Sequence, residues 1–251
     1  MATANRFALV TGTSSGIGEA VVRELLRRRW AVIGIARRSS PIADHGYRHC
    51  RFDLADLAGL TAKLEPELAA AIGSEWSRMG LVNNAATADP LGPLERDDPI
   101  VLSQTLALNL ATPCWLMGLM VRLAARKTPL RMVNVSSGAA VHPFPGLGAY
   151  AAAKAGLRMA GMVFAKELES SERPGGPRGN ATILSYEPGI VETEMQVTAR
   201  SRPTADFPWV GMFTGFHRDG ILVPPAGPAA EIADYLESDP KETFTERRFG
   251  G

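Results

Sequence analysis

Short apolar runs alternate with longer amphipathic stretches along most of the chain. The runs have the length and composition of buried strands and fall at residues 7–10, 31–35, 51–54, 80–86, 131–138 and 182–186. Between them, apolar residues at helical spacing predict helices near residues 19–29, 57–71, 106–125 and 150–168. Strands that alternate with helices in this way form parallel sheets. We therefore expect one domain of the α/β class over residues 1–251, a single doubly wound parallel sheet with helices on both faces.

A glycine-rich turn, Thr11-Gly12-Thr13-Ser14-Ser15-Gly16-Ile17-Gly18, joins the first predicted strand to the first predicted helix. Glycines let the backbone approach a pyrophosphate closely, and the helix N-terminus presents free N–H groups, so this order suits a dinucleotide. The spacing is Gly-x-x-x-Gly-x-Gly rather than Gly-x-Gly-x-x-Gly, and a tight connection without a ligand is the alternative. We expect the cofactor at Gly12, Ser14, Ser15, Gly16, Ile17 and Gly18.

Two arginines, Arg37 and Arg38, follow the second predicted strand. In dinucleotide folds an acidic residue here binds the 2′-hydroxyl of NAD, whereas arginine accommodates the 2′-phosphate of NADP. The pair therefore favours NADP(H) over NAD(H), although a solvated surface pair is the alternative. Asp53, beside Leu54, is expected at the adenine, and capping the helix that follows is its alternative role. The strand over 80–86 leaves Asn84, Ala85 and Ala86 at its carboxyl end, where ligands bind in parallel sheets.

Tyr150 and Lys154 begin an alanine-rich stretch that is predicted to be helical. Residues four apart share one face of a helix, so the phenol and the ammonium are expected to project together. A nearby ammonium favours the phenolate and lowers the pKa of the tyrosine towards useful acid–base chemistry. The pair alone is weak, since an exposed Tyr and Lys one turn apart are common on ordinary helices.

Composition and charge narrow the function classes. The 251 residues are 45% hydrophobic, enough for one sizeable core, and the net charge of +1 gives no reason to expect nucleic acid or an anionic membrane. The apolar helix over 106–125 contains Asn109, Pro113 and Arg122, which argues against a membrane span. Cys50 and Cys114 lie far apart, which suggests reduced thiols, and residues 1–6 are too short and polar for a signal peptide. We expect a cytoplasmic protein.

Taken together, these motifs resemble the short-chain dehydrogenase/reductase family, a Rossmann-type fold, over essentially the whole chain. The matching stretches are Thr11-Gly12-x-x-x-Gly16-x-Gly18, Asp53, Asn83-Asn84-Ala85, Asn109, Ser137, Tyr150-x-x-x-Lys154 and Pro188-Gly189-x-x-x-Thr193. Within the family the chain looks most like sepiapterin reductases and bacterial benzil reductases, through Tyr186-Glu187-Pro188-Gly189, Glu192-Thr193-Glu194-Met195-Gln196 with Ala199-Arg200, and Gly220-Ile221-Leu222-Val223. The end of the chain, Thr245-Glu246-Arg247-Arg248-Phe249, differs from sepiapterin reductases, which bind the pterin through an aspartate there.

The resemblance implies that Tyr150 donates a proton to a carbonyl oxygen while a nicotinamide delivers hydride to the carbon. Lys154 would lower the pKa of Tyr150 and hold the nicotinamide ribose. Ser137, thirteen residues before Tyr150 (150 − 137), would hydrogen-bond the carbonyl oxygen. Asn109 would hold a water that links Lys154 to solvent, although a bond to the backbone is the default role of a polar residue in an apolar helix. The remaining cofactor contacts implied are Pro188, Gly189, Val191 and Thr193.

The resulting hypothesis is an NADPH-dependent carbonyl reductase that acts on a ketone or α-dicarbonyl. Two alternatives stay open: an NAD-linked alcohol dehydrogenase, and a dinucleotide-binding regulator without turnover. No metal site is expected. The helices over 106–125 and 151–168 carry many apolar and small residues, and the family commonly pairs them, so we expect a homodimer or homotetramer.

Residues 193–225 show no strand or long helix but many large apolar groups: Met195, Phe207, Trp209, Met212, Phe213 and Phe216. A segment of this length inside a compact domain is usually functional, often as a lid. We expect it to close over a bulky or aromatic substrate, with Phe144 as a further wall. Packing in the core or in a dimer contact is the alternative for each residue taken singly.

Overall fold

A computed structural model describes residues 5–73 and 75–251 of the chain. Within these ranges, seven parallel strands form one sheet in the order β3-β2-β1-β4-β5-β6-β7. The strands are β1 (Arg6–Thr11), β2 (Ala31–Ala36), β3 (Tyr47–Arg51), β4 (Arg78–Asn83), β5 (Leu130–Val135), β6 (Ala181–Glu187) and β7 (Phe244–Arg248). The chain winds outward in both directions from the β1–β4 pair, so the expected doubly wound parallel sheet is confirmed.

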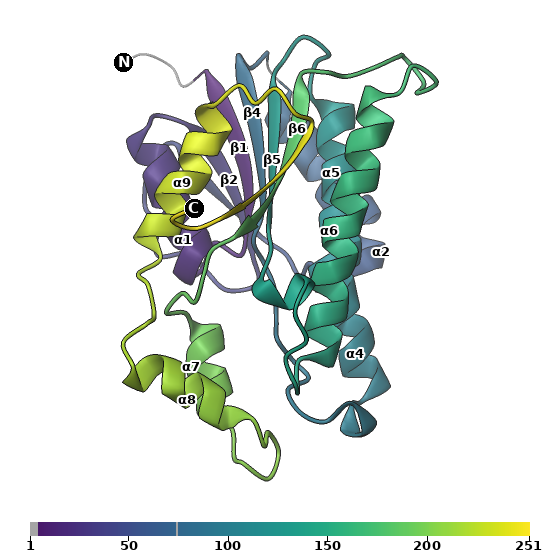
Figure 1. Ribbon diagram of the computed structural model, residues 1–251. Helices are drawn as coiled ribbons and strands as arrows, with labels where there is room; N and C mark the ends of the chain where they lie inside the picture. The colour runs from purple at the N-terminus through teal and green to yellow at the C-terminus, as the bar shows by residue number, and fades with distance from the viewer. Residues whose placement is uncertain (1–4, 74) are drawn as a thin grey trace.

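Helices cover both faces of the sheet (Figure 1). Helices α1 (Gly16–Arg27) and α9 (Ala226–Glu237) pack on one face. The other face carries three longer helical stretches: α2 (Leu57–Gly59) to α3 (Glu65–Ile72), α4 (Pro99–Leu106) to α5 (Thr112–Leu123), and α6 (Gly148–Glu169). The first two of these stretches each contain a wider π-helical turn, at Leu60–Leu64 and Ala107–Ala111.

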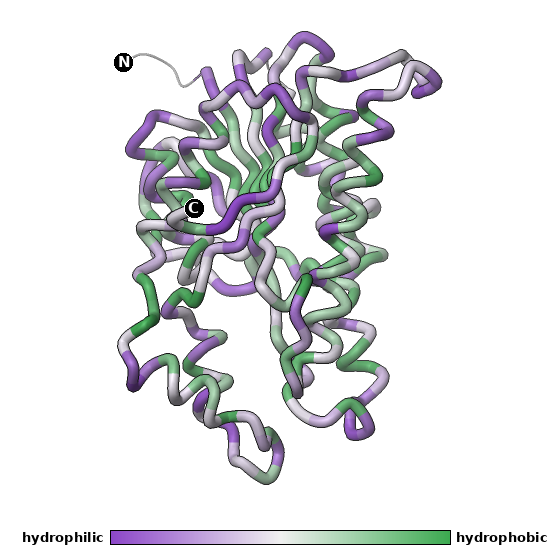
Figure 2. Tube along the Cα trace, in the orientation of Figure 1, coloured by the Kyte–Doolittle hydropathy of each residue, from purple (hydrophilic) through white to green (hydrophobic). Residues whose placement is uncertain are grey.

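The five inner strands, β1, β2, β4, β5 and β6, are buried on both sides, which explains why they are mostly apolar. Along β1, Phe7 and Leu9 face the α5 and α6 side, whereas Ala8 and Val10 face α1 and α9. Figure 2 accordingly shows mostly apolar colour along the central strands. A strand with polar alternation would not fit between two helical layers.

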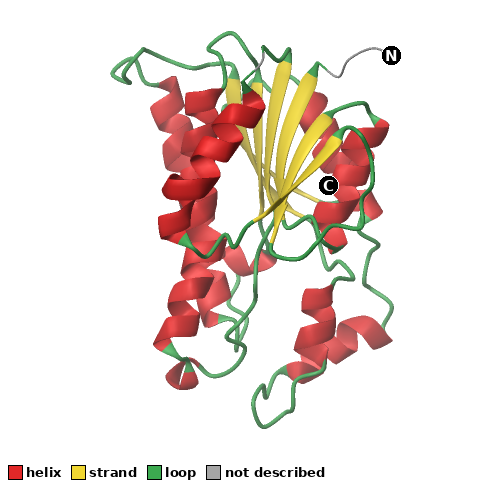
Figure 3. Ribbon diagram, turned by 180° about the vertical axis from the view of Figure 1, so that it is seen from behind, coloured by secondary structure: helices red, strands yellow, loops and turns green. Residues whose placement is uncertain are grey.

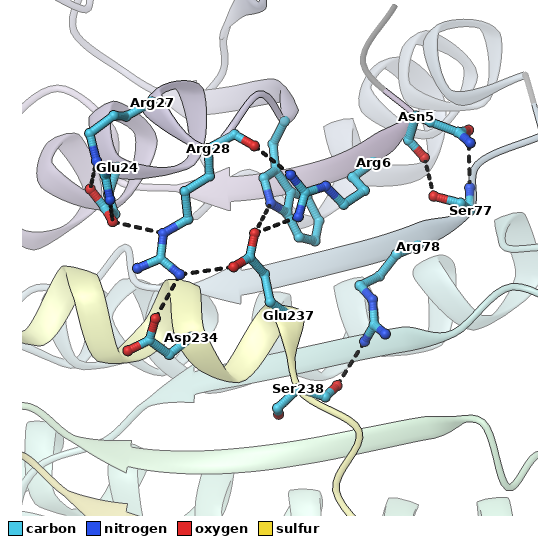
Figure 4. Close-up of polar contacts among 11 residues, drawn as sticks. Asn5, Arg6, Glu24, Arg27, Arg28, Ser77, Arg78, Asp234, Glu237 and Ser238 are labelled. Carbon is cyan, nitrogen blue, oxygen red and sulfur yellow. Dashed lines mark hydrogen bonds and ion pairs between the residues drawn. The ribbon is translucent and has the colours of Figure 1, made fainter. Parts of the chain in front are cut away.

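The amino edge of the sheet is tied to the C-terminal helix by a network of charged groups (Figure 4). Arg28, at the end of α1, donates to Glu24 at 2.7 Å, to Asp234 at 2.6 Å and to Glu237 at 3.0 Å. Arg6 on β1 also donates to Glu237. These contacts join three elements that are far apart in the sequence. Because they lie at the amino edge, they do not cover the opposite, carboxyl edge of the sheet.

The apolar helix begins at Pro99, seven residues earlier than the predicted start at 106 (106 − 99). Asp98 caps it, because its Oδ1 accepts from the N–H groups of Ile100 and Val101 at 2.7 and 3.2 Å, and proline is well suited to the first helical position. By length and composition alone, the stretch Pro99–Leu123 could cross a membrane, but half of its apolar window is buried inside the protein. It is therefore a core helix of this fold.

Residues 193–225 contain two short helices, α7 (Glu194–Arg200) and α8 (Val210–Arg218). Both lie beyond the carboxyl ends of the strands, below the sheet in Figure 1 and again in the view from behind in Figure 3. A small hydrophobic cluster of its own holds this region together, with Phe207 and Phe213 against Leu147, Ala88 and Ala199. The predicted lack of a long regular helix in this segment is correct.

Candidate active site

The glycine turn after β1 adopts a backbone shape that favours glycine at two positions. Gly12 has φ +74° and Gly16 has φ +60°, both in the left-handed region that L side chains rarely adopt. The N–H of Gly12 donates to the carbonyl of Ile35 at 2.8 Å, which fixes the start of the turn against β2. The turn therefore presents its backbone to the carboxyl edge of the sheet, at the amino end of α1.

Gly18 has a different role from the one expected, because it does not line the cleft described below. It sits in the first turn of α1, where a Cβ would lie 2.3 Å from the carbonyl oxygen of Gly12 and 2.5 Å from Asn84 Nδ2. Both distances are shorter than any real Cβ contact. Gly18 thus lets α1 pack directly on the turn and shapes the site without touching its contents.

Thr11 and Asn84 fasten this turn to the end of β4 across the point where the sheet reverses its winding. Thr11 Oγ1 accepts from the backbone N–H groups of Asn84 and Ala85 at 2.9 and 3.0 Å. In return, Asn84 Nδ2 donates to the carbonyl of Thr11 at 2.9 Å. Ligands of open α/β sheets bind at this reversal point.

A cleft of about 700 Å³ opens along the carboxyl edge. It is lined by the predicted residues Gly12, Ser14, Ser15, Gly16, Ile17, Arg37, Arg38, Asp53, Leu54, Asn84, Ala85, Ala86, Ser137, Tyr150, Lys154, Pro188, Gly189, Val191 and Thr193. Gly18 and Asn109 are the two predicted site residues outside its wall. Residues separated by up to 181 positions (193 − 12) therefore meet in one space.

Ser137, Tyr150 and Lys154 come together at one end of this cleft. Ser137 follows β5 and begins a short turn at Gly138–Ala140, where its Oγ accepts from the N–H of Ala139 at 3.2 Å. Tyr150 and Lys154 lie in the first turns of α6, as the sequence predicts. The side chains of Ser137 and Tyr150 both line this end of the cleft.

The pKa of Tyr150 differs from the expectation that Lys154 lowers it. Burial raises the pKa of the Tyr150 phenol above its ordinary value, and the nearby hydroxyl of Ser137 opposes this rise. The ammonium of Lys154 lies 5.6 Å from the centre of the Tyr150 ring and donates instead to the carbonyl of Val135 at 2.7 Å. Burial lowers the pKa of Lys154 to about 8.

Asn109 lies in the π-helical turn Ala107–Ala111, fully buried and away from the cleft. Its Nδ2 donates to the carbonyl of Thr87 at 2.7 Å, and its Oδ1 accepts from the N–H of Thr87 at 3.0 Å. The side-chain amide is thus satisfied by the backbone, which is the default role considered above. Asn109 fixes the segment after β4, whose residue Thr87 forms part of the cleft wall.

The adenosine end of the cleft carries the two arginines in unlike surroundings. Arg37 is exposed, with its guanidinium 4.0 Å from the carboxylate of Asp53. Arg38 donates hydrogen bonds to the side chains of Ser14, Ser15 and Glu194. Asp53 Oδ1 accepts from the N–H of Ala55 at 3.0 Å, whereas Asp56 is the residue that caps the next helix, so the capping role considered for Asp53 is wrong.

Four charged residues of the cleft have no role predicted from the sequence: Asp89, Glu187, Glu194 and Arg248. Glu187 on β6 and Arg248 on β7 are register partners in the sheet, and their charged groups lie 3.4 Å apart. Glu187 could have been found, because it ends a predicted strand directly before Pro188-Gly189. Arg248 required β7 to be recognised, and β7 has too few apolar residues to show as a strand.

The cleft has the features that a dinucleotide requires. The backbone of the glycine turn forms part of the cleft wall, and side chains with hydroxyl and guanidinium donors lie at one end of the cleft. The model of the short-chain dehydrogenase family matches residues 6–204, which include all of the residues that line the cleft except Met212, Phe213, Phe216 and Arg248. The chain is a short-chain dehydrogenase. It is therefore an oxidoreductase of a family that binds NAD(P)(H).

Individual relatives of this dehydrogenase agree with that assignment. A benzil reductase ((S)-benzoin forming) of Bacillus cereus is 31% identical, over 93% of this chain and 95% of the relative. A sepiapterin reductase of Xenopus tropicalis is 28% identical, over 75% of this chain and 70% of the relative. Among solved structures, a short-chain dehydrogenase/reductase of Saccharomyces cerevisiae superposes with a TM-score of 0.83 at 25% identity, over 98% of this chain and 96% of the other.

Proposed function

We propose that this dehydrogenase is an NADPH-dependent reductase of bulky ketones or α-dicarbonyls. The observation that carries the proposal is the cleft itself. It brings the glycine turn, two arginines, Ser137 and Tyr150 together with a wall of large apolar side chains. The benzil and sepiapterin reductases among its relatives support a carbonyl substrate.

The cofactor would lie between the glycine turn and the strand ends. The backbone of Gly12 to Ile17 would bind the pyrophosphate at the amino end of α1. Arg37 and Arg38 would bind the 2′-phosphate, since charge-assisted contacts from a guanidinium fork suit a phosphate. When bound, the reduced cofactor supplies the hydride. Thr193 and Lys154 would hold its nicotinamide half.

Tyr150 would donate its phenolic proton to the carbonyl oxygen of the substrate. A phenol whose pKa is raised by burial stays protonated at neutral pH, which suits a proton donor. Ser137 would hydrogen-bond the same oxygen and stabilise the negative charge that develops on it. Asn109 would act by position only, because it holds the Thr87 segment through the backbone.

The segment over residues 193–225 would act as the lid above the substrate. Its side chains Met195, Met212, Phe213 and Phe216 line the cleft, and Phe144 adds a wall from the loop before α6. Trp209 and Phe207 do not line the cleft; Phe207 is buried in the small cluster beside it, whereas Trp209 is partly exposed. Large apolar side chains on both walls favour a flat aromatic substrate.

An oxidising, NAD-linked alcohol dehydrogenase is disfavoured by the pair of arginines at the adenosine end. A regulator without turnover would have no use for Ser137, Tyr150 and Lys154 together in the wall of one cleft. We further propose a homodimer or homotetramer and a cytoplasmic location, the latter because Cys50 and Cys114 are free thiols.

Cofactor oxidation measured at 340 nm tests the proposal, with the purified protein, NADPH or NADH, and a panel of diaryl diketones, pterins, quinones and small ketones. We expect turnover of NADPH with aromatic α-dicarbonyls. Equal rates with NADH, or activity confined to the oxidation of alcohols by NAD, would replace this proposal with the alcohol dehydrogenase.

A further inference from the structure

An ion pair connects the adenosine end of the cleft to the proposed lid. Arg38, just after β2, donates to Glu194 through both terminal nitrogens, at 3.1 and 2.6 Å. Glu194 is the first residue of α7. The same guanidinium donates to Ser14 Oγ at 3.3 Å and to Ser15 Oγ at 3.1 Å, so one side chain joins the glycine turn to the lid helix.

The two carboxylate oxygens of Glu194 accept hydrogen bonds from both terminal nitrogens of the Arg38 guanidinium. A phosphate binds the same pair of donors. A carboxylate and a phosphate dianion repel each other, so both cannot share this fork at low cost. The side chains of both residues are exposed, and exposed ion pairs contribute little to stability. A charged ligand can therefore displace Glu194 from Arg38.

We propose that Glu194 is a specificity residue that holds Arg38 until a 2′-phosphate takes its place, so that binding of NADP(H) releases the first turn of α7. This inference rests on the proposed function, in which Arg38 binds the 2′-phosphate. A cofactor without that phosphate leaves the Arg38–Glu194 pair intact. Glu194 thereby weakens the binding of NADP(H) and links it to the lid.

The neighbours of Glu194 show how its release would reach the substrate end. Thr193, directly before it, lies against the glycine turn, where a Cβ on Gly16 would be 3.3 Å from Thr193 Cγ2. Met195, directly after it, lines the cleft and packs against the cluster of Phe207 and Phe213. The released carboxylate therefore belongs to a turn that contacts both the cofactor end and the apolar wall.

Calorimetric binding of adenosine 2′,5′-bisphosphate and adenosine 5′-monophosphate tests the inference without turnover. We expect Glu194→Gln to bind the bisphosphate about threefold to tenfold more tightly than the unmodified protein and to bind the monophosphate equally well. Glu192→Gln is the matched control, because it removes the same charge two residues away, where the partners are Arg200 and His217. It should change neither affinity.

The Arg38→Ala background separates a specific contact from a general effect of charge. If Glu194 acts through Arg38, Glu194→Gln should have no effect in that background. A gain that persists there, or unchanged or weaker bisphosphate binding in Glu194→Gln alone, would overturn the inference. Failure of the proposed cofactor choice looks different: the unmodified protein would bind both nucleotides equally. In that case a gain in Glu194→Gln would still support the ion-pair mechanism, and no gain would overturn it.

Discussion

The ammonium of Lys154 donates to the main-chain carbonyl of Val135 at 2.7 Å, which joins the first turns of α6 to the end of β5. Only 3% of Lys154 is exposed, so this charge is held in a site that disfavours it. Burial lowers its pKa to about 8, compared with 10.5 for the free side chain. Lys154, which we propose to hold the nicotinamide ribose, is therefore expected to reduce the stability of the fold.

Replacing Lys154 by Met should raise the free energy of unfolding near neutral pH. This increase should be smaller at alkaline pH. Between pH values of about 8 and 10.5 the unfolded chain binds more protons at this site than the folded one, so the native protein gains stability as pH rises. The difference in the free energy of unfolding between the unmodified protein and Lys154→Met should decrease by about 2 kcal/mol from pH ~7.5 to ~9.5. Urea unfolding at both pH values measures it.

The comparison between the two proteins removes the contribution of Tyr150, whose raised pKa acts in the opposite direction at still higher pH and is present in both. Lys154→Met also loses the hydrogen bond to Val135, which lowers the gain equally at both pH values. A stability difference that does not change with pH would show that Lys154 is not the titrating group.

Tyr150→Phe should reduce carbonyl reduction by ~10²–10⁴-fold, because the substituted ring keeps its shape but has no proton to donate. Its affinity for NADPH, followed by fluorescence quenching, should stay within a few-fold. Ser137→Ala serves as a comparison, since it removes a stabilising hydrogen bond and leaves the proton donor in place. A ketone reduced at the unmodified rate by Tyr150→Phe would refute the proposed mechanism.

Much of the fold could be predicted because its signals are local. Both faces of the inner strands are buried, so each of these strands is mostly apolar, and the helices between them show helical spacing. The start of α4 at Pro99 was missed although Asp98 and Pro99 are a standard start signal. β7 lacks an apolar run, because it is an edge strand with intermediate or exposed residues throughout.

Only part of the site could be predicted from the sequence. The motif residues that line the cleft could be predicted, because the chemistry fixes their identity and spacing. Gly18 and Asn109 were placed in the site by pattern, but the close approach of Gly12 and the backbone of Thr87 explain them as packing and positioning residues. The burial that raises the pKa of Tyr150 depends on contacts between distant segments, and helical spacing with Lys154 could not reveal it.

Arg37→Ala should weaken NADPH about tenfold and NADH little, since the guanidinium is free to reach a 2′-phosphate. Its pairing with Asp53, at 4.0 Å and exposed, is too weak to hold it back. KM values for the two cofactors measure the effect. Arg48→Ala is a suitable control, because Arg48 lies on β3 and pairs with Glu67 outside the cleft. Equal losses for both cofactors would identify Arg37 as an ordinary surface residue.

The predicted oligomer can be tested on the outer side of α6. Met159 and Val163 lie one turn apart on this helix and are 55% and 49% exposed, which is unusual for large apolar residues on a helix surface. We expect light scattering to give the mass of a dimer or tetramer at micromolar concentration. The double variant Met159→Glu, Val163→Glu should give a smaller species with an unchanged circular dichroism spectrum. A monomeric unmodified protein would contradict the prediction.

The apolar wall of the cleft predicts a preference for large substrates. Phe216 and Met212 contribute to this wall from α8, and large apolar side chains are typical of sites for aromatic ligands. Burial of one aromatic ring contributes about 2–3 kcal/mol, so kcat/KM for a diaryl diketone should exceed that for acetone by at least ~100-fold. Phe216→Ala should lower kcat/KM for the diketone by about tenfold and leave acetone unaffected. Trp209→Phe, in the same segment but outside the cleft wall, should change neither. Comparable kcat/KM values for acetone and the diketone would mean that these side chains serve packing alone.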